Sequence, residues 1–285
     1  MKPARFDYYR ARSSSEAVGL LGEHGDEAKV LAGGQSLVPA MNFRLARPGI
    51  LVDVNPIREL DYVEADREQL RIGALVRHVT FEQPVTPGPT GELLRQAAHH
   101  VGHLPIRMRG TFGGSLAHAD PAAELCVIAS LLDAELVAQS TEGTRTLASS
   151  EFFQTVFTTA LRPDELLIEA RLPILPPSAQ VGFVEFSRRV GDFALTMVAI
   201  AVDMDGSRVG SGRIALGGVS DRPVRATQAE AVLTGQSLGQ DVIEEAAQTA
   251  AQEVDPIGDI HGSPEYRRDL VRVLTRRALE RVTVG

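Results

Sequence analysis

The sequence predicts an α+β protein of two domains, and three observations support this prediction. The chain has 285 residues, which is more than one compact core usually holds. Pro173, Pro176 and Pro177 interrupt regular structure between two patterned regions, as linkers between domains often do. After these prolines, three strand-like runs precede three helix-like runs, an order typical of an antiparallel sheet with a helical layer. We therefore expect domains at 1–175 and 178–285.

The N-terminal domain is expected to consist of two parts, 1–56 and 57–175, because the pattern of elements restarts after a proline at their junction. The longer of its helices is expected to begin at Pro121, since proline is favoured in the first turn of a helix. The expected elements are, in order, a helix at 13–22, strands at 28–32, 50–54 and 70–74, helices at 91–100 and 121–132, and strands at 134–138 and 166–172.

The C-terminal domain is expected to form a small three-stranded antiparallel sheet covered by helices. The last helix carries the densest group of arginines, and these alternate with apolar residues as on an amphipathic helix. The net charge of the chain is -8, and its only dense basic stretch is the polar side of this helix. We therefore predict that the chain does not bind nucleic acid. The expected elements are strands at 181–189, 193–203 and 213–219, followed by helices at 226–233, 242–254 and 264–281.

Two absences limit the classes of protein further. No apolar run is long enough to span a bilayer, and the start MKPARFDYYR lacks the apolar core of a signal peptide, so we expect a cytoplasmic protein. Cys126 is the only cysteine, so the chain can form neither an internal disulfide nor an iron–sulfur cluster, which needs about four thiolates. Cys126 lies in an apolar helix pattern and is expected to be a small buried residue.

The chain lacks the glycine fingerprints of Rossmann and Walker nucleotide sites, but it contains three Gly–Gly pairs. The pair at 33–34 follows an apolar strand in KVLAGGQSLVP, and the pair at 113–114 lies in RGTFGGSLAHADP. Glycine lets a backbone approach an anion, and successive N–H groups can then point at phosphate oxygens, with Ser36 adding a hydroxyl. Two such turns could hold the phosphates of a dinucleotide, but tight turns at strand ends are an equal alternative. The neighbours of the pair at 217–218 fit an ordinary turn.

Histidine and phenylalanine residues give less specific patterns. His99 and His103 could share a helix face as metal ligands. Gly102 and Pro105 break a helix there, so solvated or capping roles are favoured for the histidines. Phe193 opens an apolar strand, and this pattern alone predicts that it packs in the core.

AGGQS at 32–36 and TFGGS at 111–115 resemble the two double-glycine FAD motifs of the molybdenum-hydroxylase flavoproteins. These are the medium subunits of the carbon-monoxide-dehydrogenase and xanthine-dehydrogenase type. The resemblance extends over the whole chain, from FDYYRARSSSEAVGLL through DVNPIREL and RRVGDFALTMVAIAV to GDIHGSPEYRRDLVRVLTRRAL. It implies a two-part FAD-binding domain of the PCMH/vanillyl-alcohol-oxidase-like type, followed by a small domain with a three-stranded antiparallel sheet and a helical layer.

The resemblance also implies which residues bind FAD. Glu124 takes the place of an aspartate early in the helix that follows the second motif, and Phe193 would approach the flavin ring. Glu185 stands where some members have lysine and Met108 where asparagine is common, so neither is given a role. The residues that would embrace the pyrophosphate are Ala32, Gly33, Gly34, Gln35, Ser36, Thr111, Gly113, Gly114 and Ser115.

The function implied is electron transfer inside a larger complex. In the family, a large molybdenum subunit oxidises the substrate, [2Fe–2S] clusters on a small iron–sulfur subunit pass the electrons to FAD, and FAD passes them to an external acceptor. The resemblance implies a dimer of such heterotrimers. No side chain of this chain is expected to act as a catalytic acid or base, and none to bind a metal. A self-contained FAD-dependent oxidase or dehydrogenase and a flavin-free assembly module are the alternatives.

Overall fold

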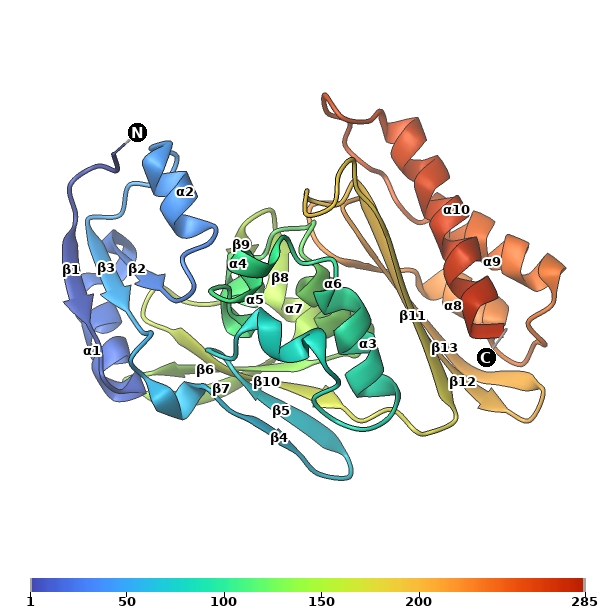
Figure 1. The fold of residues 1–285 in the computed structure, drawn as a ribbon, viewed down its shortest axis with the longest axis horizontal. Coiled ribbons are helices and arrows are strands. Elements are labelled where there is room, and N and C mark those ends of the chain that lie inside the picture. Colours follow the sequence, from blue (N-terminus) through green and yellow to red (C-terminus); the bar gives the residue numbers. More distant parts are fainter. Residues whose placement is uncertain (1, 284–285) are drawn as a thin grey trace.

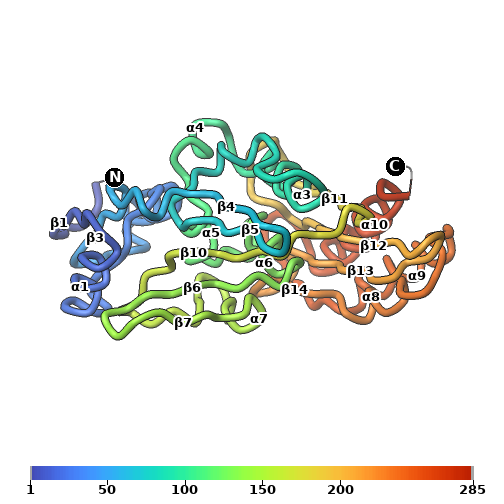
Figure 2. Tube along the Cα trace, turned by 90° about the horizontal axis from the view of Figure 1, so that it is seen from below, coloured from blue at the N-terminus to red at the C-terminus, as the bar shows by residue number. Residues whose placement is uncertain are grey.

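The computed structural model describes residues 2–283 and confirms an α+β fold. Figure 1 shows a sheet of three strands, a sheet of five strands and a sheet of four strands following one another along the long axis of the molecule. Figure 2 shows the same elongated arrangement from below. None of the helices within 2–283 is long and apolar enough to cross a membrane.

The N-terminal sheet is parallel, with the strand order β1-β3-β2. Ser13 starts α1 by accepting a hydrogen bond from the Glu16 N–H at 3.1 Å, and the helix buries Ala17, Val18 and Leu21. The helix and the two buried strands were predicted, whereas the exposed edge strand β1 and the short α2 were not. The elements are β1 (Asp7–Arg10), α1 (Ser14–His24), η1 (Gly25–Glu27), β2 (Ala28–Leu31), α2 (Leu37–Asn42), β3 (Ile50–Asp53) and η2 (Arg58–Leu60).

The central sheet is antiparallel throughout, with the strand order β4-β5-β10-β6-β7. Helices α3, α5 and α6 pack with it around buried side chains that include Phe81, Phe112 and Leu125. Its elements are β4 (Val63–Ala65), β5 (Gln69–Gly73), η3 (His78–Glu82), α3 (Pro89–Ala98), α4 (Leu104–Arg107), α5 (Phe112–His118), α6 (Glu124–Leu131), β6 (Glu135–Ser140), β7 (Gly143–Ala148), α7 (Ser149–Phe152), β8 (Phe153–Thr155), β9 (Thr158–Thr159) and β10 (Leu166–Pro173).

The expected start of the long helix at Pro121 is wrong, because α6 begins at Glu124. Asp120 forms a turn in front of the helix: its carboxylate accepts the Ala122 N–H at 2.9 Å, and its carbonyl accepts the Ala123 N–H at 2.9 Å. The sequence pattern also missed the separate helix α5, whose two glycines lower its helix propensity.

The C-terminal sheet has the order β11-β12-β13-β14, so a two-residue fourth strand joins the three that were expected. β12 begins at Thr196, and the expected strand at 193–203 is therefore too long by three residues at its start. Gly191 adopts φ +84° in the preceding turn, which places Phe193 in a loop. The elements are β11 (Ala179–Phe186), β12 (Thr196–Asp205), β13 (Arg208–Gly217), β14 (Val224–Arg225), α8 (Thr227–Leu233), α9 (Gln240–Gln252) and α10 (Pro264–Thr283).

The C-terminal sheet is covered on both faces. Phe183, Met197 and Ala199 belong to the same apolar cluster as the central helices, whereas Val198 and Ile200 belong to the cluster formed with α8, α9 and α10. Burial on both faces explains why β12 has a continuous apolar sequence instead of an alternating one.

Arg267 ties the last helix to the end of this sheet. Its guanidinium is almost fully buried and donates to the carbonyls of Leu195 and Gly218, at 2.6 and 2.9 Å, and to the Asp259 carboxylate at 2.8 Å. Arg267 therefore fixes the backbone at the open end of the β12–β13 hairpin, where β12 begins and β13 ends, next to the loop that carries Phe193.

Candidate functional site

The first glycine pair lies in the loop between β2 and α2. A Cβ atom on Gly33 would lie 2.4 Å from the carbonyl oxygen of Arg109, so no larger residue fits without separating two backbone segments. Gly34 adopts φ +72°, a conformation that side-chain-bearing residues rarely take. The two glycines are thus required for different reasons, the first by close approach and the second by its dihedral angle.

The N–H groups of this loop are available to a ligand. Among the residues that the structure describes, those at 33, 34, 35 and 36 donate to no protein acceptor. Of these residues, Gly33, Gly34 and Gln35 line a cavity of about 480 Å³. Successive free N–H groups around a glycine with positive φ form a concave donor surface for anions. The cavity is lined by Tyr8, Leu31, Ala32, Gly33, Gly34, Gln35, Val38, Pro39, Asp53, Asn55 and Arg109.

Polar side chains from other segments hold the loop in place. Asn55 donates to the Ala32 carbonyl at 2.7 Å and accepts from Arg77 at 2.7 Å. The Arg77 guanidinium also donates to the Arg109 carbonyl, so one arginine links both segments that meet at Gly33. Burial, followed by the Arg109 charge, lowers the pKa of Arg77 from its usual value. Sequence reasoning missed Asn55 and Arg77, although Asn55 follows a buried strand in DVNP.

The second glycine pair lies in the first turn of α5. Its amides are already engaged by the protein. The Gly113 N–H donates to the Ala74 carbonyl at 3.0 Å, and the Gly114 N–H donates to the Thr111 hydroxyl at 3.1 Å. A Cβ on Gly113 would lie 2.5 Å from that of Ala74, so this glycine permits α5 to pack on the strand end.

His78 contacts two residues of the second motif, Thr111 and Ser115. Its Nε2 lies 2.8 Å from the Thr111 carbonyl oxygen and 3.1 Å from the Ser115 hydroxyl. Burial lowers the pKa of His78 to about 4, so the ring is neutral at physiological pH and can donate from Nε2 to the carbonyl. The sequence gives no sign of this contact, because His78 and Thr111 are 33 positions apart.

The fold brings the two motifs side by side. Gly33 lies against Arg109 and Gly110, and a Cβ on Gly114 would be 3.9 Å from the Cβ of Ala32. Of the residues expected from the resemblance, Ala32, Gly33, Gly34 and Gln35 line the cavity. Those outside its lining are Ser36, Thr111, Gly113, Gly114, Ser115, Glu124 and Phe193.

Glu124 and Phe193 lie toward the C-terminal sheet. Glu124 is the first residue of α6, and burial together with the charge of Asp120 raises its pKa to about 7. Cys126 on the same helix is buried, as predicted, and its thiol donates to the Ser115 carbonyl at 3.4 Å. Phe193 is 68% exposed, so the prediction of core packing from its pattern is wrong.

His103 does not belong to a metal site. Its ring packs against the loop before β12, where a Cβ on Gly191 would lie 2.5 Å from the ring. It precedes α4 without making a capping hydrogen bond. Within the part of the chain that the structure describes, no three His, Cys, Asp or Glu side chains are placed to hold a metal ion.

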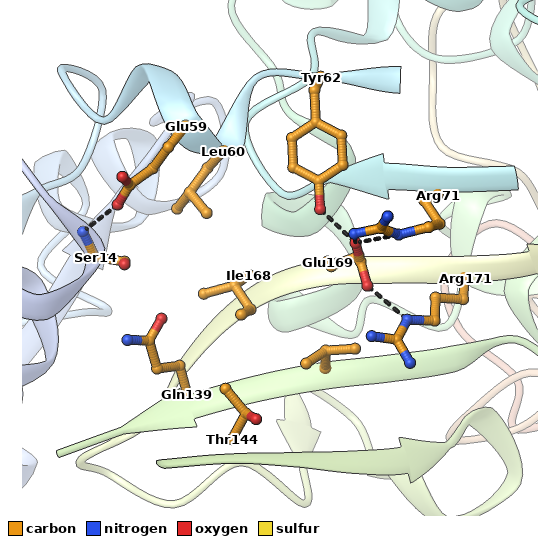
Figure 3. A pocket seen from close by; sticks show the side chains of 11 residues that line it. Ser14, Glu59, Leu60, Tyr62, Arg71, Gln139, Thr144, Ile168, Glu169 and Arg171 are labelled. Carbon is orange, nitrogen blue, oxygen red and sulfur yellow. Dashed lines mark hydrogen bonds and ion pairs between the residues drawn. The ribbon is translucent and has the colours of Figure 1, made fainter. Parts of the chain in front are cut away.

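A second cavity, of about 280 Å³, is shown in Figure 3, and the charged side chains of Arg71, Glu169 and Arg171 in its wall are paired with one another. Glu169 accepts hydrogen bonds there from Tyr62, from Arg71 at 2.9 Å and from Arg171 at 2.5 Å. Burial alone would raise the pKa of Glu169, but these hydrogen bonds hold it below its ordinary value. The groups satisfy one another and cross-link β4, β5 and β10, so this cavity is structural.

Comparison with known proteins identifies the family. Residues 4–175 match the FAD binding domain in molybdopterin dehydrogenase, and residues 182–282 match the CO dehydrogenase flavoprotein C-terminal domain. The chain belongs to this flavoprotein family. It is 41% identical to 6-hydroxypseudooxynicotine dehydrogenase complex subunit alpha of Paenarthrobacter nicotinovorans, over 98% of this chain and 95% of that protein. It is 38% identical to caffeine dehydrogenase subunit beta of a Pseudomonas species, over 99% and 96% of the two chains.

Solved structures agree with this assignment. A carbon monoxide dehydrogenase chain from Hydrogenophaga pseudoflava superposes with a TM-score of 0.96 at 32% identity, covering 100% of this chain and 99% of that one. Quinoline 2-oxidoreductase from Pseudomonas putida gives a TM-score of 0.94 at 35% identity, with the same coverage. The prediction of an FAD-carrying oxidoreductase subunit of the molybdenum-hydroxylase class is therefore confirmed, and the self-contained oxidase is not supported.

Proposed function

We propose that the loop at 32–36 binds the pyrophosphate of FAD, and the four free backbone N–H groups carry this proposal. Arg109 supplies positive charge at the cavity wall, and the Asp53 carboxylate can accept from hydroxyl groups of a ligand. A ligand with both phosphates and hydroxyls, such as FAD, fits this set. The second motif contributes its side chains and the position of α5. Glu124 and Phe193 complete the site on the side of the flavin ring.

The chain's own residues bind and orient the flavin in this proposal. Bound FAD supplies the capacity to accept and donate electrons. The loop amides hold the charged end, and the backbone contacts of Gly33 fix its distance from the second motif. His78, neutral and buried, keeps the Thr111 and Ser115 segment in one conformation.

The substrate is oxidised elsewhere, in a complex of three subunits that we place in the cytoplasm. The relatives are named as subunits or chains of dehydrogenases, which supports assembly with partners. We propose that a small iron–sulfur subunit delivers electrons and a large molybdenum subunit holds the substrate, as a dimer of heterotrimers. We also infer that the chain divides into domains at 1–175, itself of two parts, and 178–285.

Exposed apolar side chains support docking of these partners. These side chains occur on or next to helices α2 and α4 and in the loops before β12 and α10. An exposed apolar surface of this kind is typical of a protein interface. Its exposed residues are Val38, Phe43, Leu45, Leu104, Ile106, Met108, Val190, Phe193, Ile257 and Ile260.

The FAD assignment is tested by Gly34→Val. The substitution places a branched side chain at φ +72°, where the Gly34 position also meets Leu31 and Val38 at 3.2 Å, so we expect near-complete loss of FAD with the fold retained. The matched control is Gly235→Val, at φ +76° with open space around it. Flavin absorbance per folded protein gives the answer, and a fully yellow Gly34→Val protein would refute the loop assignment.

The partner assignment is tested by purifying the protein from its native host. We expect two further polypeptides, a small one with iron and a large one with molybdenum. The chain alone should leave organic substrates untouched. If the single chain, free of iron and molybdenum, oxidised an organic substrate at about 1–1000 turnovers per second, a self-contained flavin oxidase would replace this proposal.

A further inference from the structure

Glu185 has a buried carboxyl group without a partner. It lies on β11, two residues after Phe183, on the face of the sheet that packs against the central helices. Its side chain is 2% exposed, and among the described residues its Oε2 atom accepts no hydrogen bond. The nearest basic group is Nδ1 of His100, at 3.8 Å, which is beyond hydrogen-bond distance. A carboxylate in this position would be neither solvated nor neutralised.

The surroundings of Glu185 favour its protonated form. Burial, and then the charge of Glu124, raise the pKa of Glu185 to about 8. Glu124 shows the same behaviour with a pKa of about 7, and Asp120 adds a further negative charge beside it. Burial also lowers the pKa of His100, so the ring is not a reliable counter-charge at neutral pH.

No other ionisable group around Glu185 neutralises it. On the sheet, its cross-strand neighbour is the apolar Met197. The charges of His99 and of Arg281 on α10 act on His100 and lower the pKa of its ring further. The groups that face this region are therefore Glu124 from α6, Asp120 from the turn before it, His99 and His100 from the end of α3, and Arg281 from α10.

The elements that carry the two carboxyl groups are connected to the second glycine motif and to the loop of Phe193. The first turn of α6 is fixed to that motif by the hydrogen bond from Cys126 to Ser115. β11 leads directly into the Phe193 loop, and the Leu195 N–H donates to the Phe186 carbonyl at 2.9 Å. Glu124 and Glu185 are therefore on the two elements that adjoin the position proposed for the flavin ring.

We infer that Glu185 and Glu124 form a proton-holding carboxyl pair beside the flavin, and that this pair makes the reduction potential of the flavin fall more steeply with rising pH than the flavin's own protonation would. The inference rests on the proposed FAD site. While the pair keeps its protons, it adds no negative charge near the ring. When the pair loses them, two carboxylates oppose the arrival of electrons, and flavin reduction becomes less favourable.

The test is a redox titration of the flavin-loaded full-length protein at pH 6 and pH 9. We expect Glu185→Gln to leave the midpoint potential unchanged at pH 6 and to shift it to more positive values at pH 9. Glu124→Gln should act in the same direction, whereas Glu142→Gln, at a side chain 80% exposed, should follow the wild type at both values. If the Glu185 and Glu124 variants titrate in parallel with the wild type, the inference is overturned.

A second measurement does not require flavin. The folded pKa of Glu185 lies above its value in an unfolded chain, so the folded state binds more protons, and stability should fall as pH rises from about 4.5 to about 8. We expect the Tm of Glu185→Gln to fall less than that of the wild type between pH 5 and pH 9. An identical fall would refute the proton-holding pair. If the pair is confirmed but the wild type binds no FAD, the FAD site fails and the redox role of the pair fails with it.

Discussion

The loop after β2 and the first turn of α5 each contain two adjacent glycines, yet their backbone amides are used differently. In the loop, the N–H groups at 33–36 have no acceptor within the described chain. In the helix, Gly113 and Gly114 both donate to protein oxygens. The first motif is therefore open to a ligand, whereas the second is completed by the protein itself.

This difference shows that a Gly–Gly pair does not by itself define a phosphate site. Gly113 is required because α5 packs closely on Ala74, and Gly218 of the third pair adopts φ +75° close to the Leu195 carbonyl. Of the three pairs, only the one at 33–34 has a close backbone approach, at Gly33, together with amides at both positions that have no acceptor among the described residues. The unsatisfied donors are the observation on which the proposed phosphate site rests.

The largest effect is expected for Gly33→Ala. The new Cβ would overlap backbone atoms of Arg109 and Gly110, so the two motifs must separate, and FAD affinity should fall by more than about 1000-fold, or roughly 4 kcal/mol. Isothermal titration with FAD measures this loss. Gly19→Ala in α1 is the control, because nothing lies within 4 Å of its new Cβ and alanine favours a helix. If Gly33→Ala bound FAD as tightly as Gly19→Ala, the close approach at Gly33 would not be needed for FAD binding.

A smaller effect is expected for His78→Gln, through pH. The pKa of His78 is about 4 when folded and about 6.5 when unfolded, so the unfolded chain binds more protons between these values. The wild type should lose up to about 3 kcal/mol of stability as pH falls from 6.5 to 4, while the variant lacks this loss. Denaturant unfolding at pH 7 and pH 4.5 measures this difference in the free energy of unfolding. His99→Gln, at an exposed histidine, is the control. Parallel curves for His78→Gln and the wild type would contradict a buried neutral imidazole.

The smallest effect is expected for Thr111→Val. The variant keeps the shape of the side chain but removes the hydroxyl that accepts from Gly114, which should cost about 1 kcal/mol of stability. Thr111→Ser retains the hydroxyl and should be close to the wild type in unfolding experiments. A Thr111→Val protein as stable as Thr111→Ser would mean that the cap does not stabilise α5.

The sequence patterns predicted those helices and strands whose formation depends on neighbouring residues in the chain. The helix α1 was predicted from its serine cap, and β12 from an apolar run that is buried on both faces. β1 was missed because all four of its residues are exposed and give no alternation. α5 was missed because glycines oppose a helix that tertiary packing on Ala74 stabilises.

Only part of the site could be predicted from local sequence. The loop at 32–36 was identified because a buried strand runs directly into it. The contributions of Asn55, Arg77 and His78 depend on contacts between distant segments, and their spacing gives no periodic pattern. The resemblance to the family supplied Glu124 and Phe193, and both stay predictions as ligand contacts.

The buried Arg267 has a consequence for how the protein is made. This one guanidinium holds the carbonyls of Leu195 and Gly218, and it enters the structure from the first turns of the last helix. The ribosome must therefore synthesise nearly the entire chain before the loop of Phe193 can adopt its folded conformation. The loop proposed to bind the phosphates, by contrast, can form once Arg109 has been synthesised. Cofactor loading should follow this order, with the charged end of FAD captured first and the ring enclosed only after translation ends.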